Sequence, residues 1–213
     1  MGMYIITTPP PITYDYVDLG LPSGTLWATC NVGARKPTDY GLYFQWGDTI
    51  GYEAEQVGKD KQFASDYSDY KWYLSGTIDE NNLKFKKYTT PGAILDLEDD
   101  AAHVHMGGDW HIPTPDQIRE LLNNTTNTWT TQDGVNGRLF TSKKDGTKSI
   151  FIPAAGCAWD GSVLYSGIEA DVWSSMLYTD NANYGQFLNF YSGYAYLNFD
   201  YRCCGFSVRG VVG

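Results

Sequence analysis

The stretch Gly107-Gly-Asp-Trp-His-Ile-Pro-Thr-Pro-Asp-Gln-Ile-Arg-Glu-Leu-Leu-Asn123 carries the clearest secondary-structure pattern in the chain. Thr114 suits an N-cap, and Pro115 suits the first helical position because it needs no backbone N–H there. Apolar residues then follow at the spacing of one helix face, at Ile118, Leu121 and Leu122. The pattern predicts a helix over 114–123.

Outward from this helix, regular structure is sparse. A second helix is expected over 99–106, with carboxylates at its N-terminal end, and a very short third one near 37–40. The remaining pattern is short alternating strands separated by glycine turns, expected at 16–19, 26–31, 138–141, 149–153, 186–190, 194–198 and 205–211. Lys143-Lys144-Asp145-Gly146 is the expected turn between two of them. The predicted fold class is α+β, with two short helices, small antiparallel sheets and much irregular structure.

The chain has 213 residues, which suits one large domain. We expect an N-terminal extension over 1–13 and a single domain over 14–213, within which residues 50–90 form a long excursion from the core. The N-terminus lacks the pattern of a secretory signal, and no apolar run is long enough to span a membrane. A phage particle, a cell interior and a cell surface reached through a partner all stay open as locations.

Charge and tyrosine are unevenly distributed. The net charge is −10, which argues against binding to nucleic acid, and every lysine lies at or before Lys148. The stretch 178–204 is instead rich in Tyr, Asn and Asp. Antibody paratopes have a similar composition, because Tyr offers a large contact area at low entropy cost. The C-terminal part of the chain is therefore predicted to be a binding surface.

Several blocks, in order, resemble one known family. The blocks are Tyr16–Ala34, Tyr40–Gly47, Asp99–His103, Gly107–Thr114, Ile152–Gly156, Trp173–Ser175 and Gly205–Arg209. Together they resemble the Fibrobacter succinogenes major paralogous domain, which is common in Bacteroidetes proteins. The resemblance implies the C-type lectin fold in its formylglycine-generating-enzyme-like branch. One departure is His111, which stands where the family usually has Arg.

The enzymes of that branch use two cysteines a few residues apart on a strand for copper and oxygen chemistry. Here Cys203 and Cys204 are adjacent and would point to opposite sides of an extended strand. The catalytic role is therefore not carried over, and we expect neither an enzyme nor a cofactor.

The tyrosine-rich end resembles the variable region of proteins diversified by retroelements, which use the same lectin-like fold. Their adenine-directed randomisation of AAY codons yields Tyr, Asn, Asp, Ser, Cys and Gly, and never Lys, Glu or Trp. This resemblance implies a variable region over about 157–204, with Cys157, Cys203 and Cys204 as surface outcomes of randomisation. Trp159 and Glu169 would then be fixed or untargeted.

Alternation over 194–200 predicts that Ala195, Leu197 and Phe199 face inward, with the intervening residues outward. The candidate ligand-binding residues are Cys157, Trp159, Asp160, Asp171, Tyr178, Tyr184, Tyr191, Tyr194, Tyr196, Asn198, Asp200, Tyr201, Cys203 and Cys204. The alternative is that these tyrosines are ordinary strand residues with no binding role.

Other chemistry is disfavoured. His103, His105 and His111 lack the spacing of metal ligands, and the acidic residues over 96–100 lack a spaced calcium loop, so N-capping and surface charge are expected instead. Hydrolase motifs are absent, although Asp160, Asp171, Asp180 and Asp200 could converge as paired carboxylates.

The predicted function is recognition of a protein or glycan on another cell or particle, without nucleic acid, membrane insertion or metal. The alternatives are a non-diversified carbohydrate-binding or surface-associated module of the same family and, less favoured, a formylglycine-generating-type oxidase.

Overall fold

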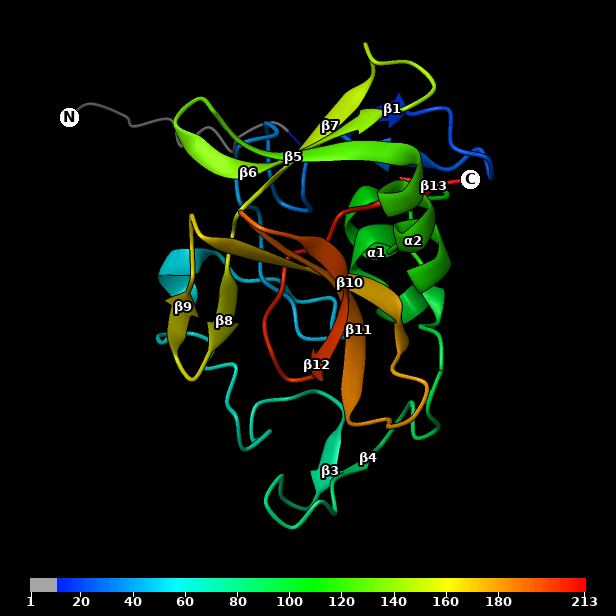
Figure 1. Ribbon diagram of the computed structural model, residues 1–213. Helices are drawn as coiled ribbons and strands as arrows, with labels where there is room; N and C mark the ends of the chain where they lie inside the picture. The colour runs from blue at the N-terminus through cyan, green and yellow to red at the C-terminus, as the bar shows by residue number, and fades with distance from the viewer. Residues whose placement is uncertain (1–10) are drawn as a thin grey trace, which may run out of the picture.

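A three-stranded antiparallel sheet, β10-β11-β12, lies at the centre of the computed structural model, which describes residues 11–213 (Figure 1). Its strands are β10 (Glu169–Leu177), β11 (Tyr184–Tyr191) and β12 (Ala195–Tyr201). Residues 1–10 of the predicted N-terminal extension lie outside the described residues. Within the described part, the other sheets are also small and antiparallel, and the only α-helices are two short ones. The predicted α+β class with two short helices and small sheets is therefore confirmed.

The other sheets surround the central one. In Figure 1 the β5-β6-β7 sheet lies at one end of the molecule and the β3-β4 pair at the other. Their strands are β1 (Tyr16–Asp18), β2 (Leu26–Ala28) and β13 (Val211–Val212); β3 (Tyr73–Ser75) and β4 (Lys84–Phe85); β5 (Thr125–Gln132), β6 (Val135–Ser142) and β7 (Ser149–Pro153); and β8 (Cys157–Trp159) and β9 (Ser162–Leu164).

The helix predicted at 114–123 is α2 (Pro115–Asn124). The Thr114 hydroxyl accepts the Gln117 N–H at 3.2 Å, and the Gln117 side chain accepts the Thr114 N–H at 2.9 Å, which closes a capping box. Ile118 and Leu121 are fully buried and pack with Leu188 and other apolar residues of the central sheet. The helix thus covers one face of that sheet, and on the other face Trp173 and Phe187 are buried against Phe206.

The second helix, α1 (Ala101–Met106), begins two residues later than predicted, after a 3-10 turn over Leu97–Asp99. Asp100 is its N-cap, since its carboxylate accepts the N–H groups of His103 at 3.0 Å and Ile112 at 2.8 Å. The expected helix near 37–40 is wrong. One turn there is closed by Asp39 N–H to Lys36 O, and a single turn cannot propagate a helix.

Most predicted strands are present, with shifted ends. The hairpin of β1 and β2 pairs Val17 with Trp27, and the predicted turn at 143–146 joins β6 to β7. The strand predicted over 205–211 is wrong. Gly205, Phe206 and Ser207 bridge to three different segments, so their backbone groups are satisfied without one continuous partner strand.

Two buried arginines anchor the C-terminal segment. Arg202 donates to the Tyr70 hydroxyl at 2.7 Å and to the carbonyls of Tyr88, Ala182 and Lys87. Arg209 donates to Asn31, Ala28 and Phe151. These bonds satisfy both guanidinium groups in the interior and tie the C-terminal segment to five separate parts of the chain, near residues 28–31, 70, 87–88, 151 and 182.

Residues 50–90 were predicted to be an excursion from the core, and this is only partly right. The segment has little regular structure, but Phe63 and Tyr67 are fully buried and Tyr70 is nearly so. Tyr67, Tyr70 and Phe85 form a cluster of their own with Cys203. The aromatic side chains of this segment therefore contribute to the core. No helix within residues 11–213 is long and apolar enough to cross a membrane.

Candidate functional site

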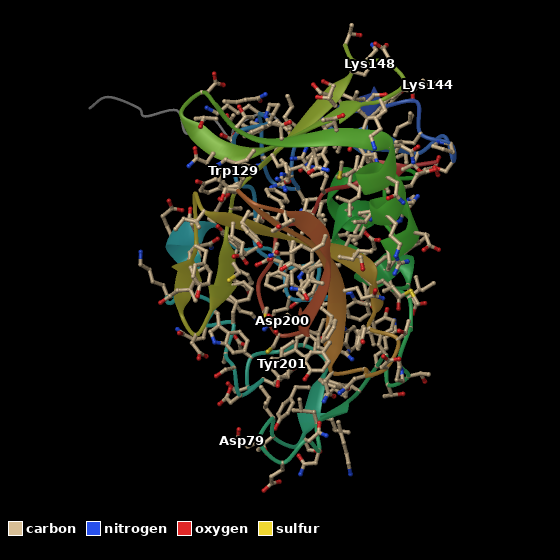
Figure 2. The ribbon with its side chains drawn as sticks, viewed as in Figure 1. Asp79, Trp129, Lys144, Lys148, Asp200 and Tyr201 are labelled. Carbon is tan, nitrogen blue, oxygen red and sulfur yellow. The ribbon has the colours of Figure 1, made fainter. Side chains whose placement is uncertain are left out.

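A pocket of about 370 Å³ opens on the face of the central sheet opposite α2, between that sheet and the β8-β9 hairpin. Its lining residues are Cys157, Trp159, Leu164, Tyr165, Glu169, Asp171, Phe187, Asn189, Asn198, Asp200, Tyr201, Cys204 and Phe206. We call it the acidic pocket, because its lining includes three carboxylates and no Lys, Arg or His. Figure 2 shows Asp200 and Tyr201 side by side at the end of β12.

Strand register brings the polar residues of this face together. Asp171 on β10 pairs with Asn189 on β11, and Asn189 in turn pairs with Tyr196 on β12. One step along, Phe187 pairs with Asn198. Because side chains alternate along a strand, all of these project from the face that α2 does not cover.

Glu169 and Asp171 share one amide donor. The Asn189 side-chain nitrogen lies 2.7 Å from Asp171 Oδ1 and 3.0 Å from Glu169 Oε1. Asp171 is only 4% exposed, and burial raises its pKa to about 8. The Asn189 hydrogen bond opposes that rise, whereas the neighbouring charges of Glu169 and Asp200 add to it. At neutral pH Asp171 is therefore mostly protonated.

Asp200 faces the same pocket from β12. Burial raises its pKa, and the hydrogen bond from Tyr201 N–H at 2.7 Å opposes the rise. Among residues 11–213, no lysine or arginine forms an ion pair with Glu169, Asp171 or Asp200. Burial thus raises the pKa of both Asp171 and Asp200, and neighbouring carboxylate charges add to the rise at Asp171.

Aromatic rings form the walls. Trp159 and Tyr201 lie with their ring centroids 6.4 Å apart and their planes 22° apart. Phe187 and Phe206 pack against each other, with centroids 4.6 Å apart. Tyr165 is 57% exposed and lies at the rim. The pocket therefore combines flat apolar faces with carboxylate oxygens.

Two thiols complete the lining. Burial raises the pKa of Cys157 to about 12, and the charges of Asp171, Glu169 and Asp200 add to the effect. Burial also raises the pKa of Cys204. Both groups are held as neutral thiols, which are poor nucleophiles and poor metal ligands.

A tight turn holds the β8-β9 hairpin at the pocket edge. Asp160 and Gly161 both have positive φ, at 43° and 74°, as an Asp-Gly hairpin turn requires. The Asp160 carboxylate accepts the Ser65 N–H at 2.7 Å. Asp160 therefore fastens the hairpin to the 50–90 segment and does not line the acidic pocket.

The pocket brings together seven of the fourteen predicted residues. These are Cys157, Trp159, Asp171, Asn198, Asp200, Tyr201 and Cys204. The other seven lie elsewhere: Asp160, Tyr178, Tyr184, Tyr191, Tyr194, Tyr196 and Cys203. Of the four acids that could have converged, Asp171 and Asp200 do so, whereas Asp160 and Asp180 do not.

Tyr178 and Tyr184 belong to an aromatic stack at the end of β12. Tyr178 lies over Phe199, with ring centroids 3.9 Å apart, and Tyr184 contacts both Phe199 and Tyr201. Phe199 was predicted to face inward, but it is 42% exposed. Phe199 lies on the same face of β12 as Ala195 and Leu197. Those two residues pack on the core under α2, whereas Phe199 lies past the end of that core.

The β11-β12 turn carries a second group of tyrosines. Tyr191 and Tyr194 contact each other edge to face, and Tyr194 and Tyr196 are exposed. They adjoin the acidic pocket through Tyr196, which is paired with Asn189. We call Tyr191, Tyr194 and Tyr196 the tyrosine rim.

The expectation that Cys203 and Cys204 lie on the surface is wrong. Cys203 is fully buried among Tyr67, Tyr70 and Phe85, and Cys204 is 5% exposed. The two side chains enter different core clusters, and only Cys204 reaches the acidic pocket. The cause is a turn at 201–204, closed by Cys204 N–H to Tyr201 O, which folds the segment inward.

Sequence reasoning missed six lining residues, namely Leu164, Tyr165, Glu169, Phe187, Asn189 and Phe206. Glu169 could have been found from its i, i+2 spacing to Asp171 on one strand. Asn189 stood within the Tyr- and Asn-rich stretch. Phe206 carries no local pattern, because it reaches the pocket through a bridge to Phe44.

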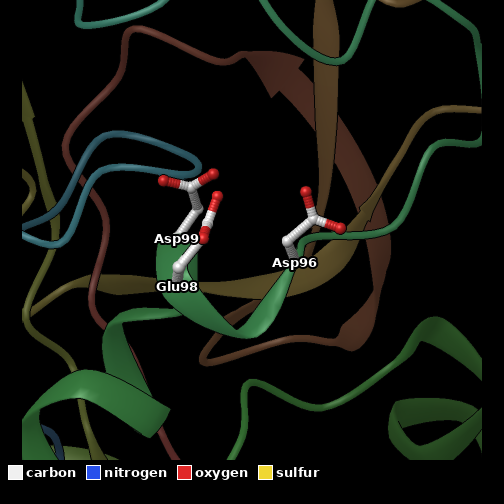
Figure 3. A group of neighbouring side chains, drawn as sticks. All are labelled: Asp96, Glu98 and Asp99. Carbon is white, nitrogen blue, oxygen red and sulfur yellow. The ribbon is translucent and has the colours of Figure 1, made fainter.

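A separate acidic group, Asp96, Glu98 and Asp99, lies at the 3-10 turn before α1 (Figure 3). Lys87 Nζ is 2.7 Å from Asp96, 3.1 Å from Glu98 and 2.6 Å from Asp99. Burial would raise the pKa of Asp99, but hydrogen bonds from Lys71, Lys87 and Tyr88 hold it below its usual value. The lysine ammonium occupies the place where a bound cation would lie.

Each histidine ring contacts a backbone carbonyl oxygen. His103 lies against Trp110 O, His105 against Thr49 O and His111 against Asp109 O. In the part of the chain that the structure describes, they form no group with metal-ligand spacing.

A larger hollow of about 530 Å³ lies on the 65–79 loops and includes Asp66, Tyr73 and Asp79. Its Asp66 carboxylate already accepts the Ser68 N–H at 2.9 Å. None of the predicted ligand-binding residues lines it, so the acidic pocket is the better candidate site. Comparisons of the chain with protein-family models, curated proteins and solved structures found no match.

Proposed function

We propose that this chain is a ligand-recognition protein in which a C-type-lectin-like scaffold presents the acidic pocket and the tyrosine rim to a protein or glycan partner. The observation that carries the proposal is the convergence of residues from β8, β10 and β12 on one pocket. Their composition supports it as well, since aromatic faces beside short polar groups suit recognition.

The proposal includes diversification of this surface by a retroelement. Asn198, Asp200 and Tyr201 are reachable from AAY codons and line the pocket, while Tyr191, Tyr194 and Tyr196 form the tyrosine rim that adjoins it. Cys203 is left out of the proposed variable surface because it is buried. The remaining alternative is a non-diversified carbohydrate-binding or surface-associated module of the same family.

The coding DNA distinguishes a diversified protein from a non-diversified module of the same family. Diversification predicts AAY-derived codons at the surface positions, a near-identical template repeat and an adjacent reverse transcriptase gene. If the template and the reverse transcriptase gene are both missing, diversification is rejected and the non-diversified module is favoured.

The proposed role is contact without covalent chemistry, and the raised pKa values of Cys157 and Cys204 support it. An oxidase of the formylglycine-generating type would need thiolates that bind copper. Copper titration of the chain and of Cys204→Ala tests this. Stoichiometric copper binding that disappears in the variant would contradict a purely recognition role.

A glycan and cell-surface protein array tests recognition itself. Binding of a partner found there should fall at least about tenfold in Trp159→Ala, because an aromatic contact residue at the centre of a site contributes on this scale. Trp129→Ala is the matched control, since Trp129 lies on β5 in a different sheet (Figure 2). Equal binding by both variants would place the ligand elsewhere and refute the pocket as the site.

A further inference from the structure

The acidic pocket has an electrostatic feature that a generic recognition surface does not need. Asp171 is only 4% exposed, yet among the described residues its carboxylate accepts a side-chain hydrogen bond at Oδ1 alone, from the Asn189 amide. Within residues 11–213 its Oδ2 accepts no hydrogen bond and forms no ion pair, and this atom keeps contact with solvent at the pocket. Buried carboxylates are normally paired, because an unpaired one is costly to ionise.

Glu169 and Asp200 repeat this arrangement on either side. Each has one oxygen engaged, Glu169 by the Asn189 amide and Asp200 by Tyr201 N–H, and the second oxygen has no hydrogen-bond partner among the described residues. The three carboxylates come from β10 and β12 and line one cavity of about 370 Å³. The pocket therefore offers several free acceptors that converge from two strands.

The walls restrict what kind of cation fits. Trp159 and Tyr201 lie nearly parallel, and Phe187 and Phe206 add further aromatic area. A small hydrated metal ion would leave these faces unused. A guanidinium ion is planar and weakly hydrated, stacks on aromatic rings and donates five N–H groups in one plane.

We propose that the acidic pocket binds a guanidinium group on an apolar stem, as presented by an arginine side chain of a protein partner. This rests on the proposed function, since it names the ligand chemistry of the same site. It favours a protein over a neutral glycan as the partner.

Proton release would accompany binding. The groups facing Asp171 are Glu169 on β10, Asn189 on β11, Tyr196 and Asp200 on β12 and the Cys157 thiol on β8, and none of them is a cation. A guanidinium would favour the ionised form of Asp171, whose pKa is about 8 in the free protein. Binding at pH 7 should therefore release up to about one proton.

The test is calorimetric titration with n-butylguanidinium, using N-butylurea as the neutral probe of the same shape. We expect saturable binding of the cation with Kd on the order of 1 mM, appropriate to so small a ligand. N-butylurea should bind at least about tenfold more weakly, and n-butylammonium, which cannot form the planar fork, should bind less tightly than the guanidinium.

Variants locate the site. Asp171→Asn and Asp200→Asn should each weaken n-butylguanidinium binding at least about tenfold, because each removes a carboxylate that lines the pocket. Asp79→Asn is the matched control, since Asp79 is exposed and lies far from Asp200 in Figure 2. No saturable binding, equal binding of the urea, or tighter binding of the ammonium would each overturn the proposal, as would unchanged binding in both pocket variants.

The array partner distinguishes this inference from the proposed function. Binding lost in Trp159→Ala but unchanged in Asp171→Asn and Asp200→Asn would overturn the guanidinium assignment and leave the pocket as the site. Binding unchanged in Trp159→Ala as well would refute the pocket.

Discussion

The buried Asp171 carboxyl should make the protein less stable as pH rises, which is opposite to the usual effect of a salt-bridged carboxylate. Its pKa is about 8 in the folded state, against about 3.9 for an unperturbed Asp. Between these values the folded state holds a proton that the unfolded state has lost. The free energy of unfolding therefore falls as pH increases through this window.

The magnitude follows from the width of the window. Each pH unit within it costs about 1.4 kcal/mol, so the contribution of Asp171 falls by about 3 kcal/mol between pH 5 and pH 7. Asp171→Asn removes the titration and keeps an oxygen that can accept from Asn189. We expect the variant to gain about 3 kcal/mol relative to the parent over the same interval.

The assay is urea unfolding at several pH values, followed by tryptophan fluorescence from the seven Trp residues. The informative quantity is the stability difference between variant and parent, because titrating groups that do not interact with Asp171 cancel from it. Asp79→Asn, an exposed position, should show no such drift. Parallel pH curves for the parent and Asp171→Asn would refute the assignment of a buried, unpaired carboxyl at this position.

Three further predictions concern the scaffold, each measured as the free energy of unfolding. Gly156→Ala should lose about 2–4 kcal/mol, because Gly156 has φ of 70° and a Cβ there would overlap the Leu164 carbonyl oxygen. Gly146→Ala is the control, since a Cβ at Gly146 meets open space. Equal losses in the two variants would contradict the reasoning. Lys87→Met should lose about 1–3 kcal/mol, because it leaves Lys71 as the remaining ion-pair partner of the buried Asp99. Lys36→Met, at an exposed pair 3.8 Å apart, should lose under about 0.5 kcal/mol. Arg202→Lys should lose about 3 kcal/mol or more, because an ammonium cannot make the four hydrogen bonds of the planar guanidinium. Arg119→Lys, at an exposed position, is the control and should be nearly neutral. A mild effect at Arg202 would count against its role as an anchor.

Local patterns predicted the elements whose stability is local. The helix α2 follows from Thr114, Pro115 and an apolar stripe, because capping and amphipathicity act within one or two turns. The alternation over 194–200 placed Ala195 and Leu197 correctly against the core. The prediction failed for Phe199. A period of two specifies which face of the strand a residue lies on, but it does not specify where the helix that covers this face ends.

Predictions from local patterns were wrong where a segment pairs with residues far away in the chain. The segment 205–211 looks like a strand, yet Gly205, Phe206 and Ser207 bridge to Ala158, Phe44 and Val172 respectively. The partners are far away in the chain, so no window of sequence contains them. Cys203 is a similar case, since its burial depends on Tyr67 and Phe85.

By itself, the sequence determined the mixed class of short helices and small sheets, the capped helix and the concentration of Tyr, Asn and Asp near the C-terminus. Only the tertiary structure decided which of those residues share a site. Side-chain periodicity acts over a few residues, whereas the pocket needs register across β10, β11 and β12 and the approach of the β8-β9 hairpin. That assembly left Asp160, Tyr178 and Cys203 outside, and it brought Glu169, Asp171 and Asp200 together with no ion-pairing lysine or arginine within residues 11–213.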